Sequence, residues 1–160
     1  MQKKKILISA CLLGKKCRYN GNNALIHQLL TLEVDWIPVC PEEEGGLGTP
    51  RKPAELTDDV KEVINNNAKV ITIDGDDVTN EFIKGAEKCI TLGLKSKAIA
   101  AILKSRSPSC SSDQVYDGSF KNRLIKGEGI FSYMCRKNAI PVISSDNYEN
   151  NKDIIKKIKS

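Results

Sequence analysis

The chain has 160 residues, of which 40% are hydrophobic and 28% are charged. That is long enough for one domain with a buried core and too short for two. Its formal net charge of +5 is modest, and the basic residues are mixed with acids except near the two ends, which favours a solvated charged face over a dedicated surface for an anionic partner. We expect a single domain over residues 1–160.

The N-terminal stretch MQKKKILISACLLG has the basic start and the apolar run of an export signal. Only five residues separate Lys5 from Cys11, fewer than the roughly 7–15 that the apolar core of such a signal needs. No window approaches the roughly 18 apolar residues of a membrane span. We therefore expect a cytoplasmic protein without a membrane partner. In that reducing compartment, its six cysteines are expected to be reduced, catalytic or metal-bound rather than paired as disulfides.

The first predicted element is a buried strand over residues 5–10, where the apolar run KILISA stops at Leu-Leu-Gly. A short helix is expected over residues 22–32, with Asn22 or Asn23 as its N-cap. A second strand follows over residues 36–40. The glycines and prolines after it predict a long ordered loop over residues 41–57, and loops of that length are usually functional or disordered.

The second half of the chain continues this alternation. Residues 60–67 are compatible with a helix and residues 69–74 with a strand. The clearest amphipathic helix begins at residues 77–79 and is expected to stop at Gly93. The remaining expected elements are a strand over residues 98–103, a polar loop over 104–128, a helix over 129–138, a strand over 140–143 and a basic helix over 147–159.

Strands that alternate with helices predict an α/β fold with a mainly parallel, Rossmann-like sheet and helices on both faces, because parallel strands need crossover connections. In such a sheet, ligands bind in the crevice beyond the carboxyl ends of the strands. We therefore expect the functional site at that edge.

Three cysteines follow predicted strands at this edge. Cys11 ends the first strand, Cys40 ends the second, and Cys110 lies in the loop KSRSPSC that leaves the strand over residues 98–103. Cys17, in the loop after the first strand, can reach the same crevice. One cysteine at a strand end is usually only buried, but three at equivalent ends favour a functional site.

The other cysteines, Cys89 and Cys135, lie on apolar helix faces and are expected to be core residues. A zinc site among the converging thiols has no Cys-x-x-Cys pair, and the one histidine, His27, is expected to be a surface or packing residue. Thiolates without histidine also suit iron–sulfur clusters. A disulfide remains an alternative at this point.

The stretch VCPEEEGGLGTPR adds an acid cluster directly after Cys40. Glu42 is the candidate general acid or base, because it lies closest to the strand end and a carboxylate shielded from water suits that work. Glu43 and Glu44 are expected only to solvate a loop. Gly45 and Gly46 can let backbone amides approach a ligand.

Polar and aromatic residues elsewhere are expected near the same crevice. Hydroxyl groups beside Cys110 can donate hydrogen bonds, and arginines can hold a carbonyl or a phosphate. The hydroxyls are those of Ser105, Ser107 and Ser109, the arginines are Arg18, Arg51 and Arg106, and the candidate rings are Tyr19, Tyr116 and Phe120.

The motifs SACLLG, CRYNG, VCPE followed by GGL and PR, SPSC, and VYDGSF occur in this order over residues 6–143. Together they resemble the thiouracil desulfurases, a bacterial family long catalogued as a domain of unknown function. The resemblance implies a compact α/β domain with an oxygen-sensitive [4Fe-4S] cluster that is held by three cysteines. The fourth iron of such a cluster is open to the sulfur of a thiolated base.

Position by position, the resemblance implies Cys11, Cys40 and Cys110 as cluster ligands, with Cys17 as a further ligand or a neighbour of the ligands. It implies Glu42 as the catalytic acid or base. Ser107 is the implied catalytic serine, and Ser105, Ser109, Gly45 and Gly46 are the implied substrate contacts. Two positions depart from the usual motifs, since this chain has Ser111 after SPSC and Asn20 in CRYNG.

The implied reaction removes sulfur from a thiouracil-type base or nucleotide, with thiolated RNA as another candidate substrate. Glu42 activates water or relays a proton while water adds to the thiocarbonyl carbon, and the sulfur leaves as hydrosulfide without net electron transfer. The aromatic content of 5% offers few stacking platforms, which favours a small substrate over a single strand.

Two other functions use the same residues. A zinc-binding structural or nucleic-acid-binding module can close a site with Cys11, Cys17, Cys40 and Cys110. A metal-free cysteine hydrolase is the other, although no histidine lies near a cysteine in the sequence to activate the thiol.

Overall fold

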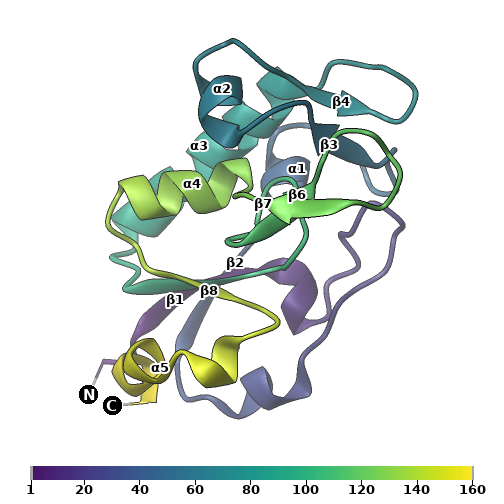
Figure 1. The fold of residues 1–160 in the computed structure, drawn as a ribbon. Helices are drawn as coiled ribbons and strands as arrows, with labels where there is room; N and C mark the ends of the chain where they lie inside the picture. Colours follow the sequence, from purple (N-terminus) through teal and green to yellow (C-terminus); the bar gives the residue numbers. More distant parts are fainter. Residues whose placement is uncertain (1, 160) are drawn as a thin grey trace.

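Four short strands form a parallel sheet at the centre of the molecule, in the order β2-β1-β5-β8 (Figure 1). The computed structural model describes residues 2–159. The strands are Lys5–Ser9 (β1), Asp35–Val39 (β2), Ala100–Leu103 (β5) and Val142–Ser144 (β8). The predicted α/β architecture with a parallel sheet is confirmed.

One face of the sheet packs against two helices. These helices are α3 (Thr79–Lys95) and α4 (Ile130–Lys137), and both lie above the sheet in Figure 1. Leu7, Ala101 and Leu103 of the sheet are fully buried in a core with Phe82, Ala86 and Phe131 of these helices. Burial of this face accounts for every second apolar residue of the strands.

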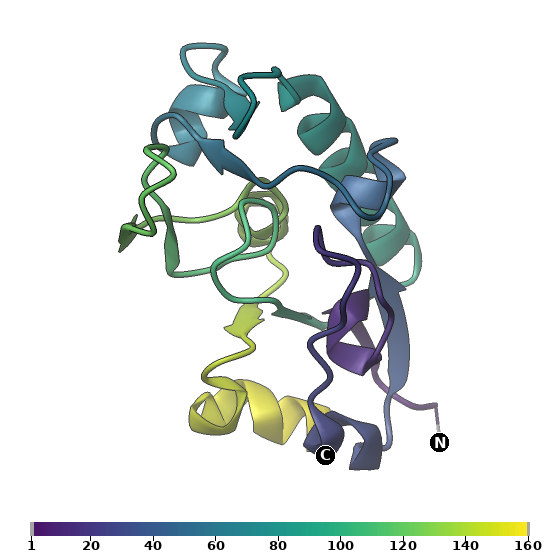
Figure 2. The same cartoon turned by 90° about the vertical axis from the view of Figure 1, so that its right-hand side faces the viewer.

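The opposite face is covered by shorter elements. These are the 3-10 turns η1 (Ala10–Leu13) and η2 (His27–Thr31), together with α5 (Lys152–Lys159). Ile6 and Ile8 of β1 are fully buried in this second core, and Figure 2 shows α5 on the side of the sheet away from α3. The sheet is therefore covered on both faces, as predicted.

Two antiparallel hairpins stand outside the sheet. The first pairs β3 (Ala54–Leu56) with β4 (Val70–Thr72) and encloses α2 (Val60–Ile64). The second pairs β6 (Gln114–Tyr116) with β7 (Leu124–Lys126). The expectation of loops over 41–57 and 104–128 was wrong for β3, β6 and β7, because strands of three residues show little periodicity in sequence. β4 does lie within the strand expected over 69–74.

The helix expected over residues 22–32 was also wrong, since only the 3-10 turn η2 forms there. The amide of Leu25 donates to the Asn23 side chain at 3.2 Å, and such local bonds compete with helix formation. The amides of Ala24 and Ile26 donate instead to the carbonyls of residues 11 and 12. This stretch therefore runs extended beside the segment that carries Cys11.

Two further boundaries differ from expectation. Gly93 does not stop α3, which continues to Lys95; a Cβ at Gly93 would lie 2.6 Å from Leu7 Cδ1, so this glycine permits close packing of the helix on the sheet. The terminal helix expected over 147–159 is divided into the turn η3 (Tyr148–Asn150) and α5. None of the helices within residues 2–159 is long and apolar enough to cross a membrane.

A short helix that follows β2, α1 (Pro41–Glu44), lies directly against α3. A Cβ on Gly85 of α3 would lie 1.7 Å from the carbonyl oxygen of Pro41, and one on Gly45 would lie 1.9 Å from the carbonyl oxygen of Glu81. Only glycine fits at both positions. This contact sets where Cys40 and Glu42 stand, because both belong to the start of α1.

This contact between α1 and α3 predicts whether a Gly→Ala substitution in α3 stabilises or destabilises the protein. In an open helix, Gly→Ala stabilises by about 1 kcal/mol, but Gly85→Ala should destabilise this protein by about 2–3 kcal/mol, because the new methyl group overlaps the Pro41 carbonyl. The midpoint of urea unfolding measures the change. Gly48→Ala is the control, since nothing lies within 4 Å of the place that its methyl group would take; a Gly85→Ala variant as stable as the wild type would contradict the packing.

A cysteine-lined cavity at the strand ends

A cavity of about 580 Å³ opens beyond the carboxyl ends of β1, β2 and β5. Ser9 and Cys11 at the end of β1, Cys40 at the end of β2, and Lys104 and Ser105 at the end of β5 all line it. The predicted location of the site, at the carboxyl edge of the sheet, agrees with this cavity.

Four thiols line the cavity, and they come from separate segments. Cys11 lies in η1, Cys17 in the following loop, Cys40 directly before α1, and Cys110 in the loop after β5. Cys40 is half-buried and the other three are buried. All six cysteines of the chain are free thiols in the structure.

The other two cysteines and the histidine lie elsewhere. Cys89 and Cys135 are almost fully buried between α3 and α4, and burial raises the pKa of each thiol to about 12. His27 is exposed in η2. The prediction of core positions for the two cysteines is confirmed.

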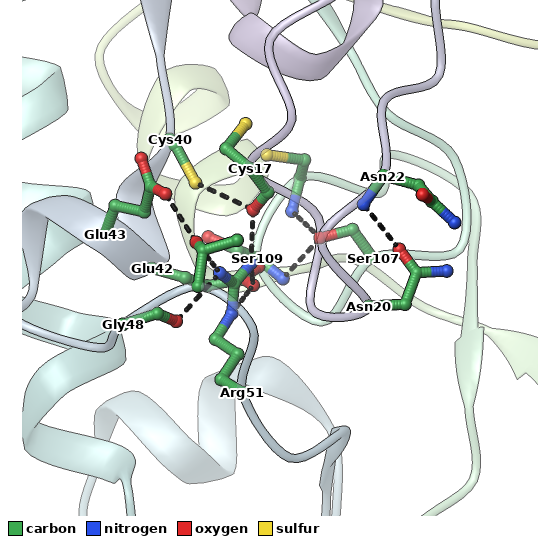
Figure 3. Close-up of polar contacts among 12 residues, drawn as sticks. Cys17, Asn20, Asn22, Cys40, Glu42, Glu43, Gly48, Arg51, Ser107 and Ser109 are labelled. Carbon is green, nitrogen blue, oxygen red and sulfur yellow. Dashed lines mark hydrogen bonds and ion pairs between the residues drawn. The ribbon is translucent and has the colours of Figure 1, made fainter.

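The cavity thiols interact with one another. The Cys40 thiol donates to the carbonyl oxygen of Cys17 at 3.7 Å (Figure 3). A hydrogen bond with Cys11 raises the pKa of the Cys17 thiol to about 11, and contact with Cys17, together with burial, raises the pKa of Cys40. Burial also raises the pKa of Cys110. Metal binding by these groups as thiolates would release protons.

Within residues 2–159, no group of three or more His, Cys, Asp or Glu side chains is arranged around one point to hold a metal ion as the side chains lie. The cavity nevertheless brings four sulfur donors to one space, and sulfur is the donor that iron–sulfur clusters use. The chemistry of this donor set fits a cluster held by three thiols.

Arg51 connects Glu42 to the segment that carries Cys17. Its Nε donates to Glu42 Oε2 at 2.8 Å, and its Nη2 contacts the same oxygen and the carbonyl oxygen of Cys17, the latter at 2.9 Å (Figure 3). The Arg51 and Glu42 side chains are only 10% and 12% exposed. No described residue donates to Oε1, so this oxygen remains available to a ligand.

The neighbouring acids differ from each other. Glu43 was expected only to solvate a loop, but it pairs with Lys15 at 3.1 Å and accepts a hydrogen bond from Thr49. Lys15 precedes α1 in the chain and Thr49 follows it, so Glu43 links this helix to the segments before and after it. Glu44 is exposed, as expected.

The loop SPSC is ordered by the first of its serines. Ser107 Oγ accepts the amides of Ser109 at 3.1 Å and Cys110 at 3.0 Å, which fixes the backbone that carries the Cys110 thiol. Ser107 and Ser105 line the cavity. The Ser105 hydroxyl donates to Asp146 at 3.1 Å.

Three residues that were predicted to contact substrate do not line this cavity. Ser109 is fully buried, and its carbonyl accepts the amides of Phe131 and Ser132 at the start of α4. Gly45 packs on α3, and Gly46 forms the turn after α1 with a φ of 96°. The glycine pair contributes to helix packing and to the turn.

Sequence reasoning missed four charged residues of the cavity lining, of which Lys104 and Glu55 are the least exposed and Lys52 and Asp76 are exposed. Lys104 lies beside Arg18 and Arg106, and burial followed by these two arginines lowers the pKa of its amine. Glu55 of β3 is 9% exposed. Neither stood out, because a charged residue after a strand or within one usually faces solvent. The predicted rings Tyr19, Tyr116 and Phe120 do line the cavity.

The buried pair of Arg51 and Glu42 makes a prediction for stability. Arg51→Ala should destabilise the reduced, metal-free protein by about 3 kcal/mol, because the variant leaves the Glu42 carboxylate buried without its partner. Arg136→Ala is the matched control, since the Arg136 side chain is half exposed in its pair with Glu128 and the pair should contribute less than about 1 kcal/mol. Urea unfolding that shows equal losses for the two variants would contradict this role of Arg51.

Comparisons with known proteins agree with this geometry. The family model described as 2-thiouracil desulfurase matches residues 6–147. The chain is 40% identical to the uncharacterized protein YbbK of Bacillus subtilis (strain 168) over 144 residues, which cover 88% of this chain and 95% of YbbK. A solved structure described as the [4Fe-4S]-dependent thiouracil desulfidase TudS is 38% identical, with a TM-score of 0.85, and the match covers 96% of this chain and 99% of TudS. The chain belongs to the 2-thiouracil desulfurase family.

Proposed function

We propose that this protein is a [4Fe-4S]-dependent desulfurase that converts a thiouracil-type pyrimidine and water into the oxo-pyrimidine and hydrosulfide. The observation that carries this proposal is the convergence of four thiols and Glu42 on one cavity at the strand ends. Membership of the 2-thiouracil desulfurase family supports the reaction and the substrate class. The name of the solved neighbour TudS supports the cofactor.

The proposed cluster ligands are Cys11, Cys40 and Cys110. Each follows a different strand of the sheet, so the three thiols approach the cavity from different directions. Cys17, which contacts Cys11 and Cys40, is proposed as a neighbour of the ligands. When bound, a cluster with three protein ligands supplies an open, Lewis-acidic iron for the thiocarbonyl sulfur.

Glu42 is the proposed general base. Arg51 holds its Oε2 from one side, so Oε1 can accept a proton from the water that adds to the thiocarbonyl carbon. The same group then gives this proton to the departing sulfur as the carbon–sulfur bond breaks, so that hydrosulfide leaves, and the hydroxyl of the adduct loses its proton to solvent as the oxo group forms. The Ser107 oxygen already accepts two amides, and its hydroxyl proton is left to orient the substrate.

A nucleotide is the proposed form of the substrate. Arg18, Lys104 and Arg106 line one part of the cavity, and the mutual repulsion of these cations contributes to the lowered pKa of Lys104. A phosphate bound there would relieve that repulsion and accept charge-assisted hydrogen bonds. The free base lacks the group that this cationic wall would recognise.

Variants of the cysteines test the cofactor. Cys11→Ala, Cys40→Ala and Cys110→Ala should each lose most of the iron that the wild type binds on anaerobic reconstitution, because each removes a ligand. Cys17→Ala should retain iron, and Cys89→Ala is the control, since its thiol lies in the core.

Glu42→Gln should keep the iron and lower kcat by about 10²- to 10⁴-fold. Full turnover by a reconstituted Glu42→Gln variant would remove Glu42 from the reaction.

A comparison of two substrates tests whether the protein recognises the phosphate of a nucleotide. Lys104→Ala should raise KM for 2-thiouridine monophosphate by roughly tenfold or more, because it removes one charge-assisted hydrogen bond, and should change KM for free 2-thiouracil much less. Lys88→Ala, at an exposed position of α3, controls for the loss of one charge. Equal effects on the two substrates would contradict a phosphate subsite, and faster turnover of thiolated RNA than of either would replace the nucleotide as substrate.

A further inference from the structure

The connection between β6 and β7, residues 117–123, forms part of the cavity wall. Phe120 and Asn122 of this connection line the cavity together with Tyr116 at the end of β6. Phe120 and Asn122 both have left-handed backbone conformations, with φ of 58° and 56°. A phenylalanine rarely adopts this conformation, whereas asparagine adopts it more readily. Hydrogen bonds within the loop link Asp117 with Ser119 and Arg123, and contacts from outside the loop hold the backbone at Phe120.

Those contacts come from Glu55, on the opposite hairpin. Its Oε1 accepts the amides of Gly118 at 2.9 Å and Phe120 at 3.2 Å. Gly118 lies directly on β3, since a Cβ there would approach the carbonyl oxygen of Leu56 to 2.8 Å. The loop is therefore bound to β3 through a side chain and fitted against its backbone.

The Glu55 carboxylate depends on the loop in turn. It is 9% exposed, and it forms no ion pair with any described residue. A buried carboxylate is costly unless it is hydrogen-bonded, and the two loop amides are the donors that it has. Loop and carboxylate are therefore coupled.

We propose that Glu55 is a positioning residue that fixes the 117–123 loop so that Phe120 forms a wall of the cavity against the pyrimidine ring of the substrate. This inference rests on the proposed function, because the ring that Phe120 contacts is the thiouracil base. An aromatic side chain suits this position, since every pyrimidine presents an apolar face that can pack on it. Glu55 acts through Phe120 and does not touch the reacting atoms.

Trypsin reports on the loop without reference to catalysis, because Lys121 and Arg123 are exposed within it. Cleavage at a folded loop requires local opening. In the reconstituted protein, Glu55→Ala should accelerate cleavage at these two positions by roughly tenfold or more. Glu55→Gln keeps an amide oxygen that can accept both N–H groups and should accelerate cleavage much less. Glu87→Ala, at an exposed position of α3, is the control for the loss of one acid.

Kinetics with 2-thiouracil test the contact with substrate. Glu55→Ala and Phe120→Leu should each raise KM by roughly tenfold, the loss of one ring contact, with a much smaller change in kcat and an unchanged iron content. Phe120→Leu keeps the backbone bonds to Glu55, so its loop should resist trypsin like the wild type. The double variant should have a KM no higher than that of Glu55→Ala, because coupled effects do not add.

Two results would overturn the inference. One is cleavage of Glu55→Ala at the wild-type rate, and the other is a KM that rises for neither Glu55→Ala nor Phe120→Leu. A wild-type protein that binds iron but turns over neither 2-thiouracil nor its nucleotide would count against the proposed function instead. In that case the trypsin experiment would still decide whether Glu55 holds the loop.

Discussion

Arg51 joins the parts of the site that the fold alone would leave separate. Its guanidinium contacts the Glu42 carboxylate, the Cys17 carbonyl and the Thr49 hydroxyl, and these belong to α1, to the loop after β1 and to the loop after α1. Because the arginine and Glu42 are both nearly buried, neither can exchange its partner for water at low cost. The position of the Cys17 segment relative to the Glu42 carboxylate therefore depends on this one side chain.

The rest of the architecture brings these parts within reach of Arg51. The parallel sheet places the ends of β1, β2 and β5 at one edge. The glycine contact between α1 and α3 sets the positions of Cys40 and Glu42 at that edge. The two hairpins then form the outer wall, joined by Glu55. The sheet positions the segments that carry the thiols, while shorter and less regular elements surround the space that a substrate would occupy.

Sequence alone predicted the features that depend on local pattern. The strands of the sheet are continuous apolar runs, and the convergence of cysteines follows from the position of each one after a strand. Contacts between segments that are distant in the chain leave no pattern in the sequence and were not predicted. Gly93 looks like a helix stop but packs on Leu7, and Gly45 looks like a ligand loop but packs on α3. Glu55 lies in a segment expected to be a loop, and its partners lie more than 60 positions away.

The central claim is that the thiol-lined cavity of this family member holds a cluster that removes sulfur from a thiolated pyrimidine. Anaerobic reconstitution of the wild-type protein with iron and sulfide, followed by metal analysis and an assay of hydrosulfide release from 2-thiouracil and its nucleotide, tests it most directly. We expect about four irons per chain, together with release of hydrosulfide. A colourless protein that takes up one zinc instead, without releasing hydrosulfide, would contradict the claim and favour a structural module.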